Sequence, residues 1–292
     1  MKARTRLAFF ALALFLPSLP AAAAKHEVRR SIEATPAGMV DIELFDGSVT
    51  VAGWDKPEVE VVAMLNHAAD EIDLERSGGA VSIEVESRHP GISRARISIS
   101  VPRGSSLRIE VMSAGVDVRD VDGDVDIEAV NGDIRIAGKP RKVRANTVTG
   151  QLALLTTGSE SLDLETVSGS LEAEGEVRYA DTSTVAGSQR LRLRGTTRGR
   201  FETMSGSLDA EIRPAPGGRF DLEAFSGDVT LAVPANVSGR FELESHSGRV
   251  RSSLAKPGDR RRDAELEFQL GDGDAIFRLE SHSGGIEVKP LP

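Results

Sequence analysis

Hydrophobic and polar residues alternate along most of this 292-residue chain, in short runs that glycine interrupts. The pattern is clearest at 200–212, which reads R-F-E-T-M-S-G-S-L-D-A-E-I. Phe201 and Thr203 fall on one face of an extended chain, and Leu208 falls on the corresponding face after Gly206. Such a phrase predicts two short β-strands that meet at a corner.

The phrase recurs with a spacing near twenty residues. Its glycines are Gly47, Gly115, Gly132, Gly150, Gly169, Gly187, Gly206, Gly227, Gly248 and Gly284. From Gly115 to Gly248 the steps are 17 to 21 residues. A period near 20 with two strands per repeat is typical of a solenoid, in which like residues stack about 4.8 Å apart. The predicted fold class is all-β: a β-solenoid of two-strand repeats of about 18–21 residues, joined by parallel ladders.

Equivalent positions of the repeat form columns, and two of them are predicted to point inward. Five residues before the glycine stand Ile42, Ile127, Leu164, Phe201, Leu222, Leu243 and Leu279. Two residues after it stand Val49, Ile134, Leu152, Leu171, Leu208, Val229, Val250 and Ile286, with Val116 shifted by one. Three before it stand the small residues Ala129, Thr147, Thr166, Thr203, Ala224, Ser245 and Ser281. A small side chain suits a crowded corner, where the glycine would supply a positive φ or room between turns.

The alternation divides the chain into three parts. Residues 1–24 are predicted to be a signal peptide, and 25–103 an N-terminal β-region that covers one end of the solenoid. Its short connections favour antiparallel neighbours. Residues 104–292 form the repetitive solenoid. Between Ala255 and Asp274 the repeat is interrupted, and we expect the apolar strand there to return as a hairpin onto 275–280 and to cover the open edge.

The first 24 residues have a basic start, an apolar run at 7–16 and an alanine-rich end, as in a cleaved secretory signal. The run is too short to span a membrane, so we expect no transmembrane segment in the mature chain and an exported protein, periplasmic or extracellular. Cleavage would remove three basic residues and change the formal net charge from −9 to −12. That charge disfavours nucleic acid and anionic lipid as partners. The chain has no cysteine, so no disulfide is available.

Three motifs resemble a known family. They are G-S-V-T-V-A-G-W-D-K-P-E-V-E-V at 47–61, I-S-I-S-V-P-R-G-S-S-L at 97–107, and the run of E-x-x-S-G phrases. The phrases begin at Glu165, Glu202, Glu223, Glu244 and Glu280. Together they resemble the bacterial putative-adhesin family, a domain of unknown function. The resemblance implies an exported or envelope-associated β-solenoid without an established enzymatic activity, and it offers no catalytic motif to transfer.

An acidic column stands four residues before the glycine. Besides Glu43, it contains the candidate binding residues Glu128, Glu165, Glu202, Glu223, Glu244 and Glu280, and it is interrupted at Asn146 and Ser183. Stacked carboxylates about 5 Å apart repel one another, so they need solvent, basic neighbours or cations. Two interpretations stay open: a stripe that binds cations or a partner, or a solvated face neutralised by arginine and lysine. No calcium-binding nonapeptide is present.

A second column stands two residues before the glycine: Phe45, Val130, Val148, Val167, Val185, Met204, Phe225, His246 and His282. We expect it to face inward at the corner as part of the core. Facing outward, it would be an apolar stripe that marks an interaction surface. The two histidines come without a fixed third ligand, so no metal site is predicted.

No catalytic residues are predicted, because the serines recur as turn residues and no G-x-S-x-G phrase exists. We therefore expect a non-enzymatic structural or binding module of the cell envelope, adhesin-like and without a cofactor, with a protein or an envelope polysaccharide as partner. The alternative is a polysaccharide-cleaving enzyme on the same scaffold, since glycoside hydrolysis needs paired carboxylates about 5–9 Å apart.

Overall fold

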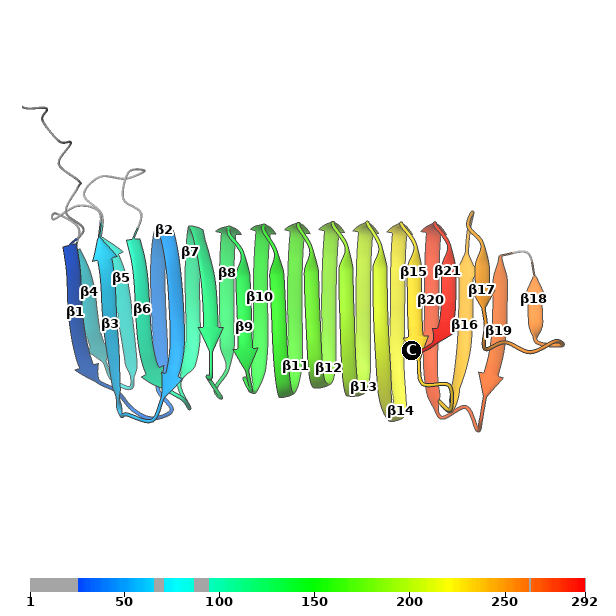
Figure 1. The fold of residues 1–292 in the computed structure, drawn as a ribbon, viewed down its shortest axis with the longest axis horizontal. Helices are drawn as coiled ribbons and strands as arrows, with labels where there is room; N and C mark the ends of the chain where they lie inside the picture. The colour runs from blue at the N-terminus through cyan, green and yellow to red at the C-terminus, as the bar shows by residue number, and fades with distance from the viewer. Residues whose placement is uncertain (1–25, 66–70, 87–94, 263, 292) are drawn as a thin grey trace, which may run out of the picture.

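The computed structural model describes residues 26–65, 71–86, 95–262 and 264–291. Across those ranges the chain is a long stack of β-strands (Figure 1), and none of them contains a helix that could cross a membrane. The predicted signal peptide at 1–24 lies outside the described residues.

In chain order the strands are β1 (His26–Glu33), β2 (Met39–Trp54), β3 (Glu58–Leu65), β4 (Glu71–Ser77), β5 (Ala80–Glu86), β6 (Ala95–Pro102), β7 (Ser106–Arg119), β8 (Val125–Asn131), β9 (Ile134–Gly138), β10 (Lys142–Thr149), β11 (Leu152–Ser168), β12 (Leu171–Ala186), β13 (Gln189–Ser205), β14 (Leu208–Ser226), β15 (Val229–Val233), β16 (Gly239–Ser245), β17 (Val250–Ser252), β18 (Arg260–Arg262), β19 (Glu265–Leu270), β20 (Ala275–Ser283) and β21 (Ile286–Pro290).

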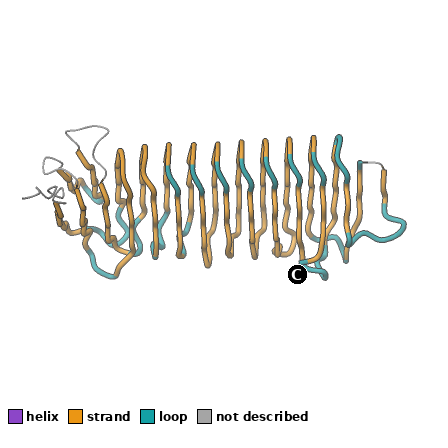
Figure 2. The backbone as a smooth tube through the Cα atoms, turned by 45° about the horizontal axis from the view of Figure 1, so that its top comes forward, coloured by secondary structure: helices purple, strands orange, loops and turns teal. Residues whose placement is uncertain are grey.

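Each repeat is one rung with two arms, which confirms the predicted β-solenoid with parallel ladders. The arms before the corner glycines form a front sheet, and the arms after them form a back sheet. In β13, residues 189–194 belong to the back sheet and 198–205 to the front sheet, and both parts pair in parallel with β12. The rungs follow one another along the axis of the stack (Figure 2).

The core lies between the two sheets and consists of the predicted inward columns. Phe201, Leu208 and Leu222 are fully buried, as are nearly all their counterparts in other rungs. Val250 is only half-buried, because it lies in β17 near the end of the stack. Near that end the core also contains an aromatic stack, with centroid distances of 4.9, 4.7 and 4.6 Å. Its members in order are Phe220, Phe277, Phe241 and Phe268.

One rung replaces both aliphatic columns by polar residues. The Thr182 hydroxyl donates to Gln189 Oε1 at 2.6 Å, and Gln189 Nε2 donates to Thr184 Oγ1 at 3.1 Å. Thr184 in turn donates to Thr203 at 3.0 Å. All four side chains are buried. Because a buried amide without partners costs about 1–3 kcal/mol, this satisfied network favours one register of β12 on β13.

The corner glycines are required by the contact between rungs. Gly206 has a φ of 140°, and a Cβ there would lie 2.1 Å from the carbonyl oxygen of Gly187. One glycine assignment was wrong: β2 and β8 place Ala114, not Gly115, level with Gly47 and Gly132. Gly115 has no positive φ, so the rung formed by β7 turns its corner with an alanine.

The C-terminal rung is inserted into the stack out of chain order. β20 pairs in parallel with β14 on one side and with β16 on the other. The hairpin expected between the interrupting strand and 275–280 is therefore wrong, because β19 pairs antiparallel with β16 instead. β20 carries the full repeat phrase, so it continues the parallel ladder, whereas β19 lacks the phrase and ends it. β18 then pairs antiparallel with β19.

At the other end, antiparallel pairs close the stack as expected: β1 with β3, β3 with β6, and β4 with β5. β2, by contrast, pairs in parallel with β5, β6 and β7. The register between β2 and β7 runs from Met39 to Ala52. β2 therefore already forms the two arms of a rung, and the antiparallel strands lie outside it.

We expect Gly206→Val to destabilise the protein by about 1–3 kcal/mol or more, because it adds a β-branched side chain at a positive φ and against the neighbouring backbone. Ser207→Ala, which removes only an exposed hydroxyl contact with Ser188 at 3.1 Å, should cost no more than about 0.5 kcal/mol. Urea titration of both variants measures the difference. Equal midpoints would contradict the role of the corner glycine.

Candidate binding face

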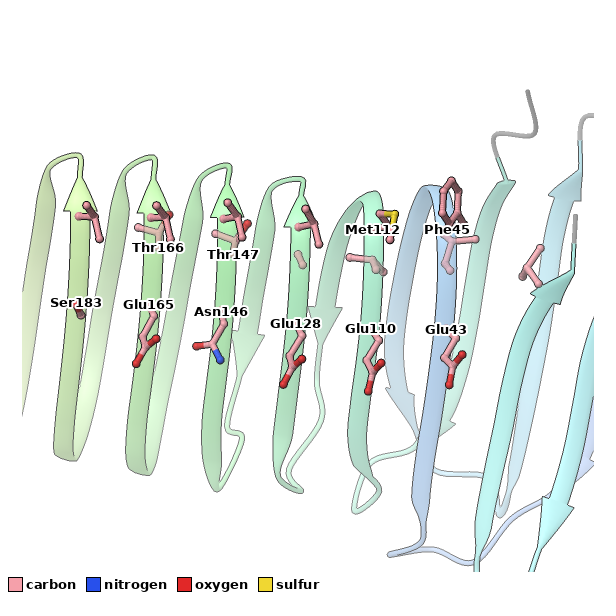
Figure 3. A pocket seen from close by; sticks show the side chains of 18 of the residues that line it. Glu43, Phe45, Glu110, Met112, Glu128, Asn146, Thr147, Glu165, Thr166 and Ser183 are labelled. Carbon is pink, nitrogen blue, oxygen red and sulfur yellow. The ribbon is translucent and has the colours of Figure 1, made fainter. Parts of the chain in front are cut away.

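The acidic column forms a continuous ladder on the outer surface of the front sheet (Figure 3). The pairing of successive strands places these residues level with one another: Glu84, Glu43, Glu110, Glu128, Asn146, Glu165, Ser183, Glu202, Glu223, Glu280 and Glu244. The structure thus brings all six predicted candidate residues together, with Glu280 between Glu223 and Glu244. We call this set the acidic ladder.

Two glutamates of the acidic ladder were missed by the sequence analysis. Glu84 lies in β5, where no repeat phrase is recognisable. Glu110 was missed because Gly115 was taken as the corner residue of its repeat. Glu110 stands five residues before Gly115, not four. Counting back from Ala114 would have found it.

The column two residues before the glycine faces outward, so the expectation that it belongs to the core was wrong. Its members are 46 % to 56 % exposed from Phe45 to Phe225. The alternation of the strand continues up to the corner: the small residue three before the glycine points inward, so the next residue points out. The ladder consists of Phe45, Met112, Val130, Val148, Val167, Val185, Met204, Phe225, His282 and His246. We call it the apolar ladder.

The two histidines extend the apolar ladder by stacking. The ring of His282 lies 4.9 Å from that of Phe225 and 4.8 Å from that of His246. Within the part of the chain that the structure describes, no group of three or more potential metal ligands occurs. The histidines of the two S-H-S-G phrases therefore stack on each other at two neighbouring corners.

The two ladders together form the binding face discussed below. They are two residues apart along each strand, so about 7 Å separates them. In the N-terminal half of the stack they line a shallow groove of about 750 Å³ that extends from Glu43 to Val185. Figure 3 shows both rows of side chains along the front sheet. Thr147 and Thr166 lie between the rows in the strands, but their side chains are buried.

The arginines of the adjacent column pair partly within that column and partly with the acidic ladder. Arg144 pairs with Asp163 at 3.2 Å and Arg278 pairs with Glu242 at 3.1 Å, level with them in the same column. Arg200 pairs with Glu202 of the acidic ladder. The relief is incomplete at Glu223. Burial raises the pKa of Glu223, and the carboxylates of Glu202 and Glu280 raise it further, while Arg200 opposes them.

A family model matches residues 39–289, which is nearly all of the described chain. Its description is Toastrack DUF4097. The chain belongs to this family. The match confirms the resemblance expected from the opening phrase, the bridge at 97–107 and the E-x-x-S-G phrases.

Several solved structures are similar to the chain at low sequence identity. A putative adhesin from Parabacteroides distasonis ATCC 8503 is 12% identical, with a TM-score of 0.48 over 92% of this chain and 98% of that chain. A putative adhesin from Bacteroides fragilis NCTC 9343 is 12% identical, with a TM-score of 0.38 over 92% and 99%. A putative lipid binding protein from Parabacteroides distasonis ATCC 8503 is 13% identical, with a TM-score of 0.39 over 91% and 97%.

No curated protein matches the chain. Similarities as low as those of the solved structures do not carry a function across, so the function of this Toastrack domain is inferred from its own residues.

We expect Glu223→Gln to stabilise the protein at about pH 7 and to change its stability little at about pH 3.5. The pKa of Glu223 is raised in the folded state, so the folded protein holds its proton more tightly than the unfolded chain does. The stability from this group is thus present below its ordinary pKa and is lost as the pH rises through the raised value. Urea midpoints at the two pH values measure the effect.

The matched control is Glu172→Gln on the back sheet, which removes the same charge but breaks the 3.0 Å ion pair with Arg190. It should give no gain at neutral pH. A loss of stability for Glu223→Gln at neutral pH would show that the ladder carboxylates do not repel one another.

Proposed function

We propose that this protein is an exported, non-enzymatic binding module of the bacterial cell envelope, adhesin-like in its role, and that the binding face holds a protein partner. The observation that carries the proposal is the apolar ladder. Its aliphatic and aromatic side chains are about half exposed in every rung from Phe45 to Phe225. Large contiguous apolar patches on soluble proteins mark interaction surfaces.

Exposure of the apolar ladder to water is energetically unfavourable for a monomer. Complete burial of such a side chain contributes roughly 1.5–3 kcal/mol. A side chain that is half exposed has gained only part of this free energy, and a partner that covers it would supply the rest. The core column beside it shows that the repeat has buried positions available for the same residue types. Val148 and Val167 lie outside the core in successive front-sheet strands, so their exposure is a repeated feature rather than a single defect.

The neighbouring acidic ladder defines the chemistry of the partner. A surface that covers both ladders must bring apolar groups to one row and basic groups to the other, about 7 Å away. It must also be elongated, since the rows follow the axis of the stack. Acidic polysaccharides and anionic lipids fit this face badly, because the carboxylates repel them.

The same geometry supports binding over catalysis. Carboxylates recur at nearly every rung, and a regular row offers no distinguished acid and base pair of the kind that glycosidases use. The raised pKa of Glu223 has its causes in burial and in the carboxylates of its two ladder neighbours. The alternative of a polysaccharide-cleaving enzyme receives no support from a specific side-chain arrangement.

A photo-reactive phenylalanine analogue in place of Val167 tests the binding face in the producing cells. We expect it to crosslink one discrete protein partner, because Val167 lies in the centre of the apolar ladder. The matched control is the same analogue at Leu155, which is 55 % exposed against 46 % for Val167 but lies on the back sheet. Glu128→Gln combined with Glu165→Gln should weaken the crosslink. Equal capture from both positions would overturn the proposal.

Incubation with a panel of envelope polysaccharides tests the absence of catalysis. We expect no release of reducing sugar above the level of heat-denatured protein, since no acid and base pair is set apart on the acidic ladder. Reproducible turnover that Glu202→Gln or Glu223→Gln abolishes would replace the binding proposal by the enzymatic one.

A further inference from the structure

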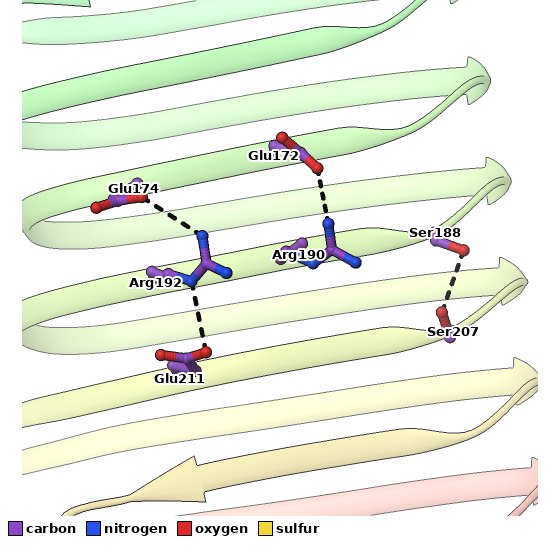
Figure 4. Close-up of polar contacts among 7 residues, drawn as sticks. All are labelled: Glu172, Glu174, Ser188, Arg190, Arg192, Ser207 and Glu211. Carbon is purple, nitrogen blue, oxygen red and sulfur yellow. Dashed lines mark hydrogen bonds and ion pairs between the residues drawn. The ribbon is translucent and has the colours of Figure 1, made fainter. Parts of the chain in front are cut away.

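Several arginines on the two sheets form ion pairs with acids of the neighbouring rung. On the back sheet, Arg190 pairs with Glu172 at 3.0 Å (Figure 4). Arg192 lies between two rungs and pairs with Glu174 at 3.5 Å and Glu211 at 3.4 Å. This arrangement follows from the stacking, because residues at the same repeat position lie about 4.8 Å apart and interact directly.

Four arginines of β13 and β14 are instead placed beside one another. Arg194 lies level with Arg213 on one side and with Glu176 on the other, and Arg198 lies level with Arg219. All four are exposed, and among the described residues none of them forms an ion pair. Like charges placed directly opposite on neighbouring strands destabilise a sheet. In a chain with a formal net charge of −9, such a concentration of unpaired positive charge indicates a role outside folding.

The four side chains lie at the edge of the stack opposite the corner glycines. Arg194 and Arg213 stand near the end of the back-sheet arms, and Arg198 and Arg219 at the start of the front-sheet arms. A small cleft of about 310 Å³ opens there. Its lining consists of Arg198, Arg219, Phe220, Asp221, Ile276 and Arg278. Asp221 contributes the single carboxylate of the lining, and Arg278 is already paired with Glu242.

We propose that Arg194, Arg198, Arg213 and Arg219 form an arginine cluster that binds an acidic polysaccharide. Guanidinium groups bind carboxylate and sulfate groups through two parallel hydrogen bonds, and pairs of arginines on successive rungs present such donors at a regular spacing along the edge. Tyr179 adds an aromatic ring on the next strand, level with Arg198, on which a sugar ring can stack. Arg178 lies over that ring at 5.5 Å.

Other polyanions fit the cluster less well. Nucleic acid is disfavoured because tight binding needs more phosphate contacts than four arginines supply. An anionic membrane would need apolar side chains to insert, and of the residues that line the cleft only Ile276 and Phe220 are aliphatic or aromatic, with Phe220 buried in the core. Arg198 and Arg219 lie on the same front-sheet strands as Glu202 and Glu223, four residues away at the far end, so about 13 Å separates them from the acidic ladder. The proposal does not rest on the function proposed above.

The experiment measures binding of fluorescent oligogalacturonate, a linear carboxylated glycan, to the full chain by anisotropy at several salt concentrations. We expect Arg198→Gln with Arg219→Gln to weaken binding about tenfold or more and to flatten its salt dependence. The matched control, Arg190→Gln with Arg192→Gln, removes the same charge from the back sheet and should leave affinity within about twofold. Because the test substitutions relieve repulsion, the urea midpoint should not fall.

A heparin oligosaccharide, neutral dextran and vesicles with phosphatidylglycerol complete the design. Binding of oligogalacturonate or heparin that needs the arginine cluster, with no binding of dextran, supports the proposal. Equal loss in the two double variants would show unspecific charge attraction and overturn it. Binding to vesicles but to neither acidic glycan would assign the cluster to a membrane surface, and binding to none of the probes would also overturn the proposal.

Discussion

The close approach of successive glycines at one corner is the constraint on which the structure depends. A Cβ at Gly169 would lie 1.8 Å from the carbonyl oxygen of Gly150, and one at Gly187 would lie 1.7 Å from that of Gly169. At these two corners only a residue without a side chain permits the contact, and the backbone then continues from rung to rung in one register on either side of the corner. The inward columns, the polar network around Gln189 and the outer ladders are aligned because that register does not drift.

Because the register is constant, the residue type at each repeat position determines the chemistry of one row on the surface. A residue type that recurs at one position becomes a row of identical groups about 4.8 Å apart. Where acids and arginines alternate, as at Glu172, Arg190 and Asp209, the row is largely self-neutralising. Where one type persists, the row keeps a charge or an apolar character that its own neighbours cannot satisfy. The acidic ladder, the apolar ladder and the arginine cluster are three such cases among the described residues.

These surfaces lie in different places and have opposite chemistry. The apolar and acidic ladders share the front sheet near the corner glycines, while the arginine cluster occupies the far edge. A rigid stack holds such sites at a fixed separation, since each rung contacts only its neighbours and adds one increment of length. A module of this kind can connect two partners without a hinge.

The sequence by itself determined the all-β solenoid, the inward columns at Phe201 and Leu208, and the six glutamates of the candidate site, because alternation and spacing are local properties that a period near 20 exposes. The sequence also implied that Val167 points outward, because strict alternation places it on the opposite face from Thr166. The expectation that this column belongs to the core did not take that alternation into account. Only the tertiary structure decided the position of β20 between β14 and β16. Every copy of the phrase offers the same parallel edge, so pairing energy alone does not distinguish the neighbours. Loop connections and the antiparallel strand β19 make that choice, and with it they place Glu280 between Glu223 and Glu244.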